Sequence, residues 1–207
     1  MATVKRVYDG SGRRAQAELN RVAILDAAGD LFLSAGYAAT AIPDVAATAG
    51  VSVELVYKRF GGRPGLARAV VERALEGAGP VPAEQRSDAL STTDARDLVR
   101  QWGQLTAEVA PRVAPMLLLV RAAAAHDPEM IALATELDAS RRSRMTANAR
   151  RLHKTGQLRA GVTVKIAADV LWTYSSPELF ELLVLRSKWP IARYAAFVAD
   201  GITAQVF

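Results

Sequence analysis

The sequence predicts an all-α fold, on three observations. Hydrophobic residues make up 51% of the 207 residues, alanine is very frequent, and only short Val/Ile runs occur. The apolar residues recur at helical spacing and do not show the strict alternation of half-buried strands. Paired start and stop signals for helices occur along the chain, most clearly in residues 39–60.

Residues 39–60, ATAIPDVAATAGVSVELVYKRF, are typical of two short helices joined by a tight turn. Thr40 is a candidate cap of the first helix, and Pro43 suits its first turn because the N–H that proline lacks is unpaired there. Gly50 can end this helix, since glycine adopts the left-handed conformation at no steric cost. Ser52 can then cap the second helix.

The spacing of small and apolar residues in this pair is that of a helix-turn-helix. Ala46, four residues before Gly50, is small enough for two helices to cross steeply. Val56 and Phe60, four residues apart, give the second helix a buried stripe. The second helix of such a motif enters the major groove of DNA. An ordinary helical hairpin gives a similar pattern and is the alternative for this stretch taken alone.

The flanking residues extend the pattern, with RVAILDAAGDLFLSAGYAAT before it and GGRPGLARAVVERAL after it. From about residue 21 to residue 75 the chain resembles the TetR family of transcriptional regulators. The matching positions agree in order and spacing, and they are Arg21, Ile24, Leu25, Ala27, Ala28, Leu31, Phe32, Gly36, Tyr37, Thr40, Ala46, Ala49, Gly50, Val51, Ser52, Tyr57, Phe60 and Leu66.

The resemblance implies an N-terminal three-helix helix-turn-helix domain that a fourth helix joins to a C-terminal helical domain for ligand binding and dimerisation. The DNA-binding domain is expected at residues 19–76, with its first helix at about 17–34 and its fourth at about 63–76. Residues 77–93, rich in Gly, Pro and Ser, are the expected linker. Residues 94–207 are the expected effector-binding and dimerisation domain.

Residues 1–18 are expected to form a basic flexible arm, or else a solvated tail. Their four basic side chains stand among Gly, Ser and Asp, and are Lys5, Arg6, Arg13 and Arg14. After the linker at least five helices are expected, the first starting at a Thr92 or Thr93 cap. They cover about residues 94–109, 111–125, 128–154, 163–172, 177–186 and 191–206, with Pro111 and Pro115 at the first break.

The residues expected to contact DNA are Thr40, Ser52, Val53, Leu55, Tyr57, Lys58 and Arg63. The family resemblance places base contacts near Val53 and Leu55, and phosphate contacts at Thr40, Tyr57 and Arg63, where lysine is the commonest family residue. Two apolar side chains can touch thymine methyl groups but form no hydrogen bonds, so base reading falls to Ser52 and Lys58. Simple packing is the alternative for Leu55.

The family also implies an internal pocket for a small effector in the C-terminal part. Aromatic and methionine side chains there suit an apolar or amphipathic ligand, although each can equally be ordinary core. The candidates are Trp102, Met116, Met145, Trp172 and Tyr174.

Two further surfaces are predicted in this part. Residues 141–159 carry seven basic side chains and no acidic one, which favours a solvated helix face, with a second nucleic-acid surface as the alternative. The last two helices hold more apolar residues than one small domain needs. In the family such helices form a four-helix bundle between two subunits, so a homodimer with two recognition helices one turn of DNA apart is expected.

Several classes of protein are excluded or disfavoured. The chain has no cysteine, no metal-binding or cofactor-binding motif, and no hydrolase, P-loop or dinucleotide signature, and its two histidines lie far apart. An enzyme, a metal site and a cofactor are therefore not expected. No apolar run reaches the length of a membrane span and no signal peptide is evident, so no membrane association and a cytoplasmic location are expected.

The function predicted is that of a ligand-responsive, DNA-binding transcriptional regulator. In the manner of the family it is a repressor that a small, largely apolar effector releases from a palindromic operator. Activation instead of repression stays open. The alternative is a helical small-molecule-binding or interaction protein without specific DNA binding. The net charge of +5 is compatible with DNA, but residues 1–76 hold ten Lys and Arg against eight Asp and Glu, so any DNA affinity depends on where the charges stand.

Overall fold

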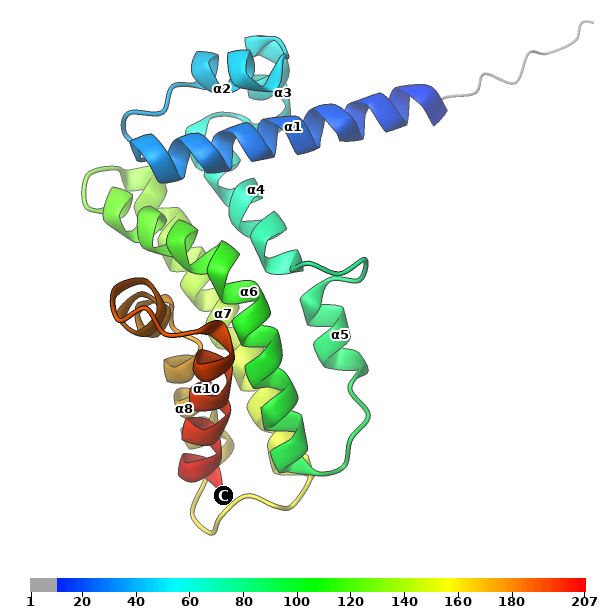
Figure 1. The fold of residues 1–207 in the computed structure, drawn as a ribbon, viewed down its shortest axis with the longest axis vertical. Coiled ribbons are helices and arrows are strands. Elements are labelled where there is room, and N and C mark those ends of the chain that lie inside the picture. The colour runs from blue at the N-terminus through cyan, green and yellow to red at the C-terminus, as the bar shows by residue number, and fades with distance from the viewer. Residues whose placement is uncertain (1–10) are drawn as a thin grey trace, which may run out of the picture. The chain divides into compact units, whose positions relative to one another are not determined.

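A computed structural model describes residues 11–207, which form helices and no strand (Figure 1). The predicted all-α class is therefore confirmed. In chain order the elements are α1 (Ser11–Ala35), α2 (Ile42–Ala49), α3 (Val53–Phe60), α4 (Arg63–Glu76), α5 (Ala83–Ala89), α6 (Ala95–Ala124), α7 (Pro128–Lys154), α8 (Val164–Tyr174), α9 (Pro177–Phe180), the π-helical η1 (Glu181–Arg186) and α10 (Ile191–Val206).

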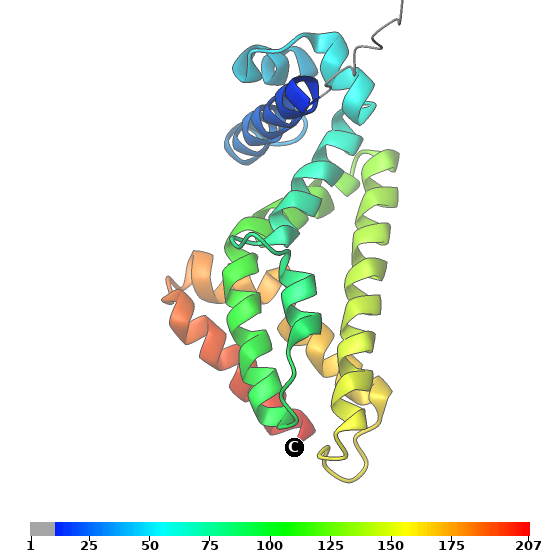
Figure 2. The same cartoon turned by 90° about the vertical axis from the view of Figure 1, so that its right-hand side faces the viewer.

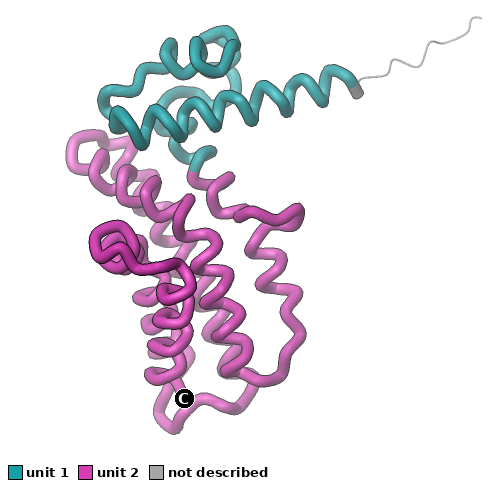
Figure 3. Tube along the Cα trace, viewed as in Figure 1, with its two compact units in different colours: residues 1–70 teal, residues 71–207 magenta. Residues whose placement is uncertain are grey.

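The chain divides into two compact units, residues 1–70 and 71–207 (Figure 3). The boundary falls inside α4, after Val70, and not in the predicted linker at 77–93. That segment contains a helix of its own, α5, in which Ala83 and Ser87 lie four residues apart and are both buried. Two small residues on one face are too weak a signal to predict a helix between Gly/Pro-rich stretches.

In the first unit, α1 begins at Ser11, so residues 11–18 of the predicted flexible arm are helical. Its first turns contain Ala, Arg, Gln and Glu, all good helix formers. Lys5 and Arg6, the other two basic residues of that arm, lie outside the described residues. The helix ends as predicted at Gly36, whose φ is +86° and whose N–H donates to the Phe32 carbonyl.

The core of the first unit lies among α1, α2, α3 and the start of α4. The side chains from α1 that are completely buried include Ile24, Leu25 and Phe32. They are joined by Val45 from α2 and Val56 from α3, also fully buried. Val56 is the one fully buried residue of α3, and Phe60, the other residue of the predicted buried stripe, is half-buried.

In the second unit, residues 95–124 form one helix, α6, and the two helices predicted on either side of Pro111 are wrong. A proline removes one backbone hydrogen bond and crowds the preceding turn. Here Ala110, Val113 and Ala114 are buried on the same stretch, so tertiary packing keeps the helix continuous. The start also differs, because Asp94 caps α6 and the Thr92 hydroxyl accepts from the Asp94 N–H.

The core of this second unit forms where α6, α7, α8, α9 and α10 meet. Tyr194 and Phe180, both nearly inaccessible to solvent, meet edge to face with ring centroids 5.5 Å apart. Gly103 of α6 lets α10 approach closely, since a Cβ there would lie 2.9 Å from the carbonyl oxygen of Ala195. The predicted starts of α7 at Asp127, α8 at Thr163 and α9 at Ser176 are confirmed, each by a side chain that accepts backbone N–H groups.

Helix α5 lies against both α6 and α7 (Figure 2). Two arginines of α7 hold it. Arg144 donates to the carboxylates of Glu84 (3.0 Å) and Asp88 (2.8 Å), and Arg151 donates to the backbone carbonyls of Ser87 and Leu90.

The basic run 141–159 is therefore mainly a structural element, and the predicted solvated face is wrong for most of it. Arg142 pairs with Asp169, and Arg141 donates to the Trp172 carbonyl over 2.6 Å. Arg159 donates to the Gln205 carbonyl. These arginines pair with carboxylates or donate to backbone carbonyls of neighbouring helices. A count of charges along the sequence does not reveal such partners.

Candidate nucleic-acid interface and ligand pocket

The turn of the helix-turn-helix is built as the sequence predicted. Gly50 has φ +66° and ends α2, where the Val51 N–H donates to the Ala46 carbonyl. Ser52 caps α3, its hydroxyl accepting the Leu55 N–H over 3.2 Å. A hydrogen bond with its own backbone, and after it one with the Ser52 side chain, lowers the pKa of the Glu54 carboxyl. The carboxylate thus stays ionised at the positive end of α3.

The outward face of α3 carries the side chains suited to DNA. Tyr57 is 51% exposed although it is a large aromatic residue, and Lys58 is exposed beside it. Arg59, which was not among the predicted contacts, is also exposed on α3 and adds a second cation. Its position next to Lys58 in the last turn was the signal that could have identified it.

The remaining predicted residues of α3 are arranged less simply. Ser52 is exposed but occupied with the cap, while Val53 and Leu55 are half-buried. Half-buried apolar side chains at the start of the helix fit both methyl contacts with thymine and packing.

Thr40 points inward. Its side chain is 2% exposed and its hydroxyl donates to the Gly36 carbonyl over 2.9 Å. The residue that caps α2 is Ala41, which offers no side-chain acceptor, so the predicted capping role of Thr40 is wrong. The physical reason is competition, because the hydroxyl satisfies a carbonyl left unpaired at the end of α1.

Arg63 begins α4 and turns back to the α1–α2 connection. Its Nη1 donates to the carbonyls of Tyr37 (3.3 Å) and Ala38 (3.1 Å), and its Cζ lies 4.9 Å from the centroid of the Tyr37 ring. The side chain is therefore committed to contacts within its own domain.

The α3–α4 junction depends on glycines. Gly61 and Gly62 have φ of +75° and +156°, which side chains rarely tolerate, and the Gly61 N–H donates to the Tyr57 carbonyl over 2.8 Å. Gly65 lies so close to the end of α3 that a Cβ would collide with the Phe60 carbonyl. These residues fix the direction in which α4 leaves the recognition helix.

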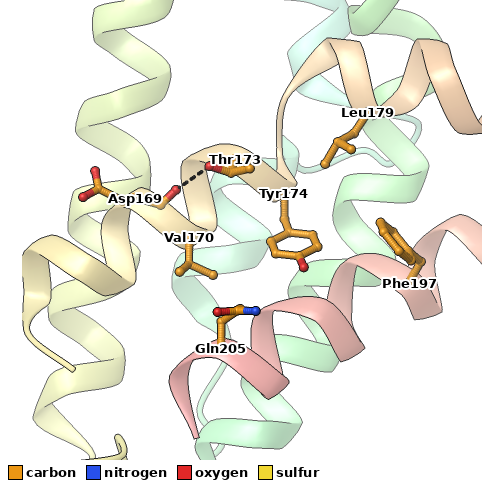
Figure 4. Close-up of a pocket in the computed structure, with 7 residues that line it drawn as sticks. All are labelled: Asp169, Val170, Thr173, Tyr174, Leu179, Phe197 and Gln205. Atoms are coloured by element: carbon orange, nitrogen blue, oxygen red, sulfur yellow. Dashed lines mark hydrogen bonds between the residues drawn. The ribbon is translucent and has the colours of Figure 1, made fainter. Parts of the chain in front are cut away.

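A pocket of about 380 Å³ lies in the second unit among α8, α9 and α10 (Figure 4). Its lining is mainly apolar, with three polar side chains at Asp169, Thr173 and Gln205; the other lining residues are Val170, Tyr174, Leu179 and Phe197. The Tyr174 ring stands at the centre of the view and lies against Gly201, where a Cβ would come 2.6 Å from the hydroxyl.

Of the predicted ligand residues only Tyr174 lines this pocket. Trp102 and Met116 are core residues, 5% and 1% exposed. Met145 packs against the core, and Trp172 is half-buried beneath Arg141, whose Cζ lies 4.7 Å from the ring centroid. Trp102 and Met116 are kept out of the pocket by burial in the core, and Met145 and Trp172 by contacts with other helices. Composition alone could not distinguish these residues from pocket residues.

A third surface runs along η1 and the start of α10. Three large apolar side chains are exposed there, to 50%, 39% and 39%, and they are Leu182, Leu185 and Ile191. None of the helices in residues 11–207 combines the length and apolarity needed to cross a lipid bilayer.

These features together define a helix-turn-helix protein with a separate helical unit. Residues 24–70 match the model of the bacterial regulatory proteins of the tetR family. Over 68 residues the chain is 41% identical to the HTH-type transcriptional regulator AlkX of Mycobacterium tuberculosis, a match that covers 33% of this chain and 31% of that protein. The chain is thus matched over less than a third of that relative's length.

The N-terminal helix-turn-helix domain of this chain is therefore a TetR-family DNA-binding domain. The family is not one of enzymes, in agreement with the prediction. Two solved structures have the same fold over both units. A SmeT–triclosan complex has a TM-score of 0.69 with 24% identity, covering 90% of this chain and 91% of that one. A regulator from Saccharomonospora viridis in complex with choline has a TM-score of 0.69 with 18% identity, covering 92% and 98%.

Proposed function

We propose that this protein is a ligand-responsive repressor that binds a palindromic operator as a homodimer in the cytoplasm. The observation that carries DNA binding is the exposed surface of α3, where Tyr57, Lys58 and Arg59 are all open to solvent while Val56 is fully buried. A phenol and two cations on the outer face of a recognition helix suit phosphate contacts at the edges of a major groove.

Dimerisation through the last helices is supported by the exposed apolar side chains of η1 and α10. Large apolar side chains left exposed on successive elements are typical of an interface between subunits. A two-fold dimer presents two copies of α3 to successive half-sites, and this arrangement explains why the operator is expected to be palindromic.

For the effector we propose a small, largely apolar molecule held in the pocket of α8, α9 and α10. The rings of Tyr174 and Phe197, whose centroids lie 5.9 Å apart, offer apolar contact, and Thr173 and Gln205 offer hydrogen bonds. Complexes of similar structures with triclosan and with choline support a small-molecule effector. Helix α10 lines the pocket and also belongs to the proposed dimer surface, so ligand binding can shift the population of subunit arrangements.

Titration of the purified protein against duplexes selected from a random-sequence pool, at two salt concentrations, tests the DNA-binding proposal. We expect saturable binding to a palindrome that weakens steeply with salt, because neutralised phosphates release counterions. Binding that is weak and indifferent to sequence would favour the alternative, a helical ligand-binding or interaction protein.

Thermal-shift screening of small molecules tests the effector site separately. Compounds that raise the melting temperature should lose this effect in Gln205→Trp, which places a bulky ring on the pocket rim. Ala204→Trp is the matched control, since Ala204 is exposed on the same helix and does not line the pocket. A compound whose shift survives Gln205→Trp binds elsewhere.

A further inference from the structure

The connection between α1 and α2 is held by a side chain that follows it by 25 residues in sequence. Tyr37 is buried in this connection, and its ring stacks on Phe32 with centroids 5.8 Å apart. The guanidinium of Arg63 lies over the same ring, 4.9 Å from its centroid. Its Nη1 donates to the two successive carbonyls of Tyr37 and Ala38.

The contact ties together parts of the domain that must keep a fixed geometry on DNA. The connection leads directly into Ala41, whose carbonyl accepts the first N–H groups of α2, those of Asp44 (3.1 Å) and Val45 (3.2 Å). Helix α2 in turn packs on α3. Arg63 follows the other end of α3, immediately after the Gly61–Gly62 turn. Its contact with the α1–α2 connection therefore links the end of the motif back to its start.

The chemistry of the contact is specific to arginine. A guanidinium is planar, so one group can lie over an aromatic ring and direct N–H donors to neighbouring carbonyls. A lysine ammonium carries the same charge but has no planar face, and it cannot reproduce both contacts.

We propose that Arg63 is a positioning residue for DNA binding, which holds the α1–α2 connection and thereby the start of α2 in the geometry that the recognition helix needs. This inference rests on the proposed function only for its effect on DNA. The hold on the connection is a property of the free protein.

The substitution Arg63→Lys tests the proposal because it keeps the charge and removes the planar contacts. We expect amide hydrogen exchange at Asp44 and Val45 to become about tenfold faster, the order of magnitude for one lost hydrogen bond to a charged donor. Affinity for the selected operator should fall about tenfold. The slope of log K against log salt should stay the same, because lysine keeps the positive charge and the number of neutralised phosphates does not change.

Arg59→Lys is the matched control, since Arg59 is exposed at the end of α3 and the same exchange of cation is made. It should leave exchange at Asp44 and Val45 unchanged. Wild-type exchange rates or wild-type affinity in Arg63→Lys would overturn the proposal and show that a positive charge suffices at this position. If the wild-type protein binds no operator, the repressor proposal fails, and the exchange measurement alone decides the positioning role.

Discussion

Single glycines set the geometry of the DNA-binding domain at the scale of one residue. Gly65 is in the first turn of α4, where a Cβ would collide with the backbone carbonyl of Phe60. Gly29 is also helical, but a Cβ there would meet only a side-chain atom of Val70 at an ordinary 3.7 Å. The same substitution at these two positions should therefore have opposite effects.

We expect Gly65→Ala to destabilise the first unit by about 1–3 kcal/mol, because the collision is with backbone and the junction has to shift. Gly29→Ala should stabilise it by up to about 1 kcal/mol, because alanine is the better helix former. Amide exchange in α1 to α3 measures both. A neutral or stabilising Gly65→Ala would show that the close approach of α4 to α3 is not required.

Arginines attach a short helix at the scale of one element. Seven residues are too few for a stable helix in water, and α5 buries only two small side chains, Ala83 and Ser87. Its other attachments are polar, and they come from α6 and α7. The segment predicted as a linker is thus ordered by partners that lie far away in sequence.

We predict that Arg144→Ala loosens α5, with amide exchange in Ala83–Ala89 becoming several-fold faster. Its partners Glu84 and Asp88 are largely exposed, so the cost in stability should be only about 0.5–1 kcal/mol. Arg150→Ala is the control, because Arg150 is an exposed member of the same basic run. Equal exchange in the two variants would argue against the attachment.

The other attachment of this segment predicts a pH dependence. Glu108 accepts from Arg86 (2.5 Å) and from the Ala78 N–H (2.9 Å), and these hydrogen bonds, Arg86 first, lower the pKa of its carboxyl from 4.5 to about 2. A lowered pKa means that the native state favours the ionised form. The resulting stability is complete above pH 4.5 and is lost as the pH falls through about 2.

Glu108→Gln should therefore destabilise the second unit at pH 7, by about 1–2 kcal/mol after allowance for solvent screening. The difference from wild type should shrink between pH 4.5 and pH 2. Urea unfolding followed by tryptophan fluorescence measures it, since all three tryptophans lie in residues 71–207. A difference that does not change with pH would contradict an ionic origin.

At the scale of the whole molecule, the proposed dimer determines whether two recognition helices reach one operator. Leu182 is half-exposed, so a charge there should leave the subunit folded. We expect Leu182→Glu to give monomers by sedimentation and to lose operator binding, because it places a charge in the centre of an apolar interface. Ile166→Glu, at an apolar side chain of α8 that is 44% exposed, is the control and should remain dimeric. A dimeric Leu182→Glu would place the interface elsewhere.

Signals within a few residues of one another were enough to predict much of the fold. The stop at Gly36, the turn at Gly50, the cap at Ser52 and the start of α7 at Asp127 follow from backbone preferences and side-chain hydrogen bonds that act locally. The helix-turn-helix and the family were recognisable for the same reason, since both depend on spacing along one short stretch.

Long-range packing decided the rest. Pro111 predicts a break that burial overrides, Thr40 predicts a cap whose hydroxyl has a better partner, and the charges of 141–159 find partners up to 64 residues away. The sequence by itself determined which class of protein this is and where its recognition helix lies, because those features are local. Only the tertiary structure decided what Arg63 contacts, which aromatic residue lines a pocket, and how α5 is held, because each depends on a neighbour brought close by folding.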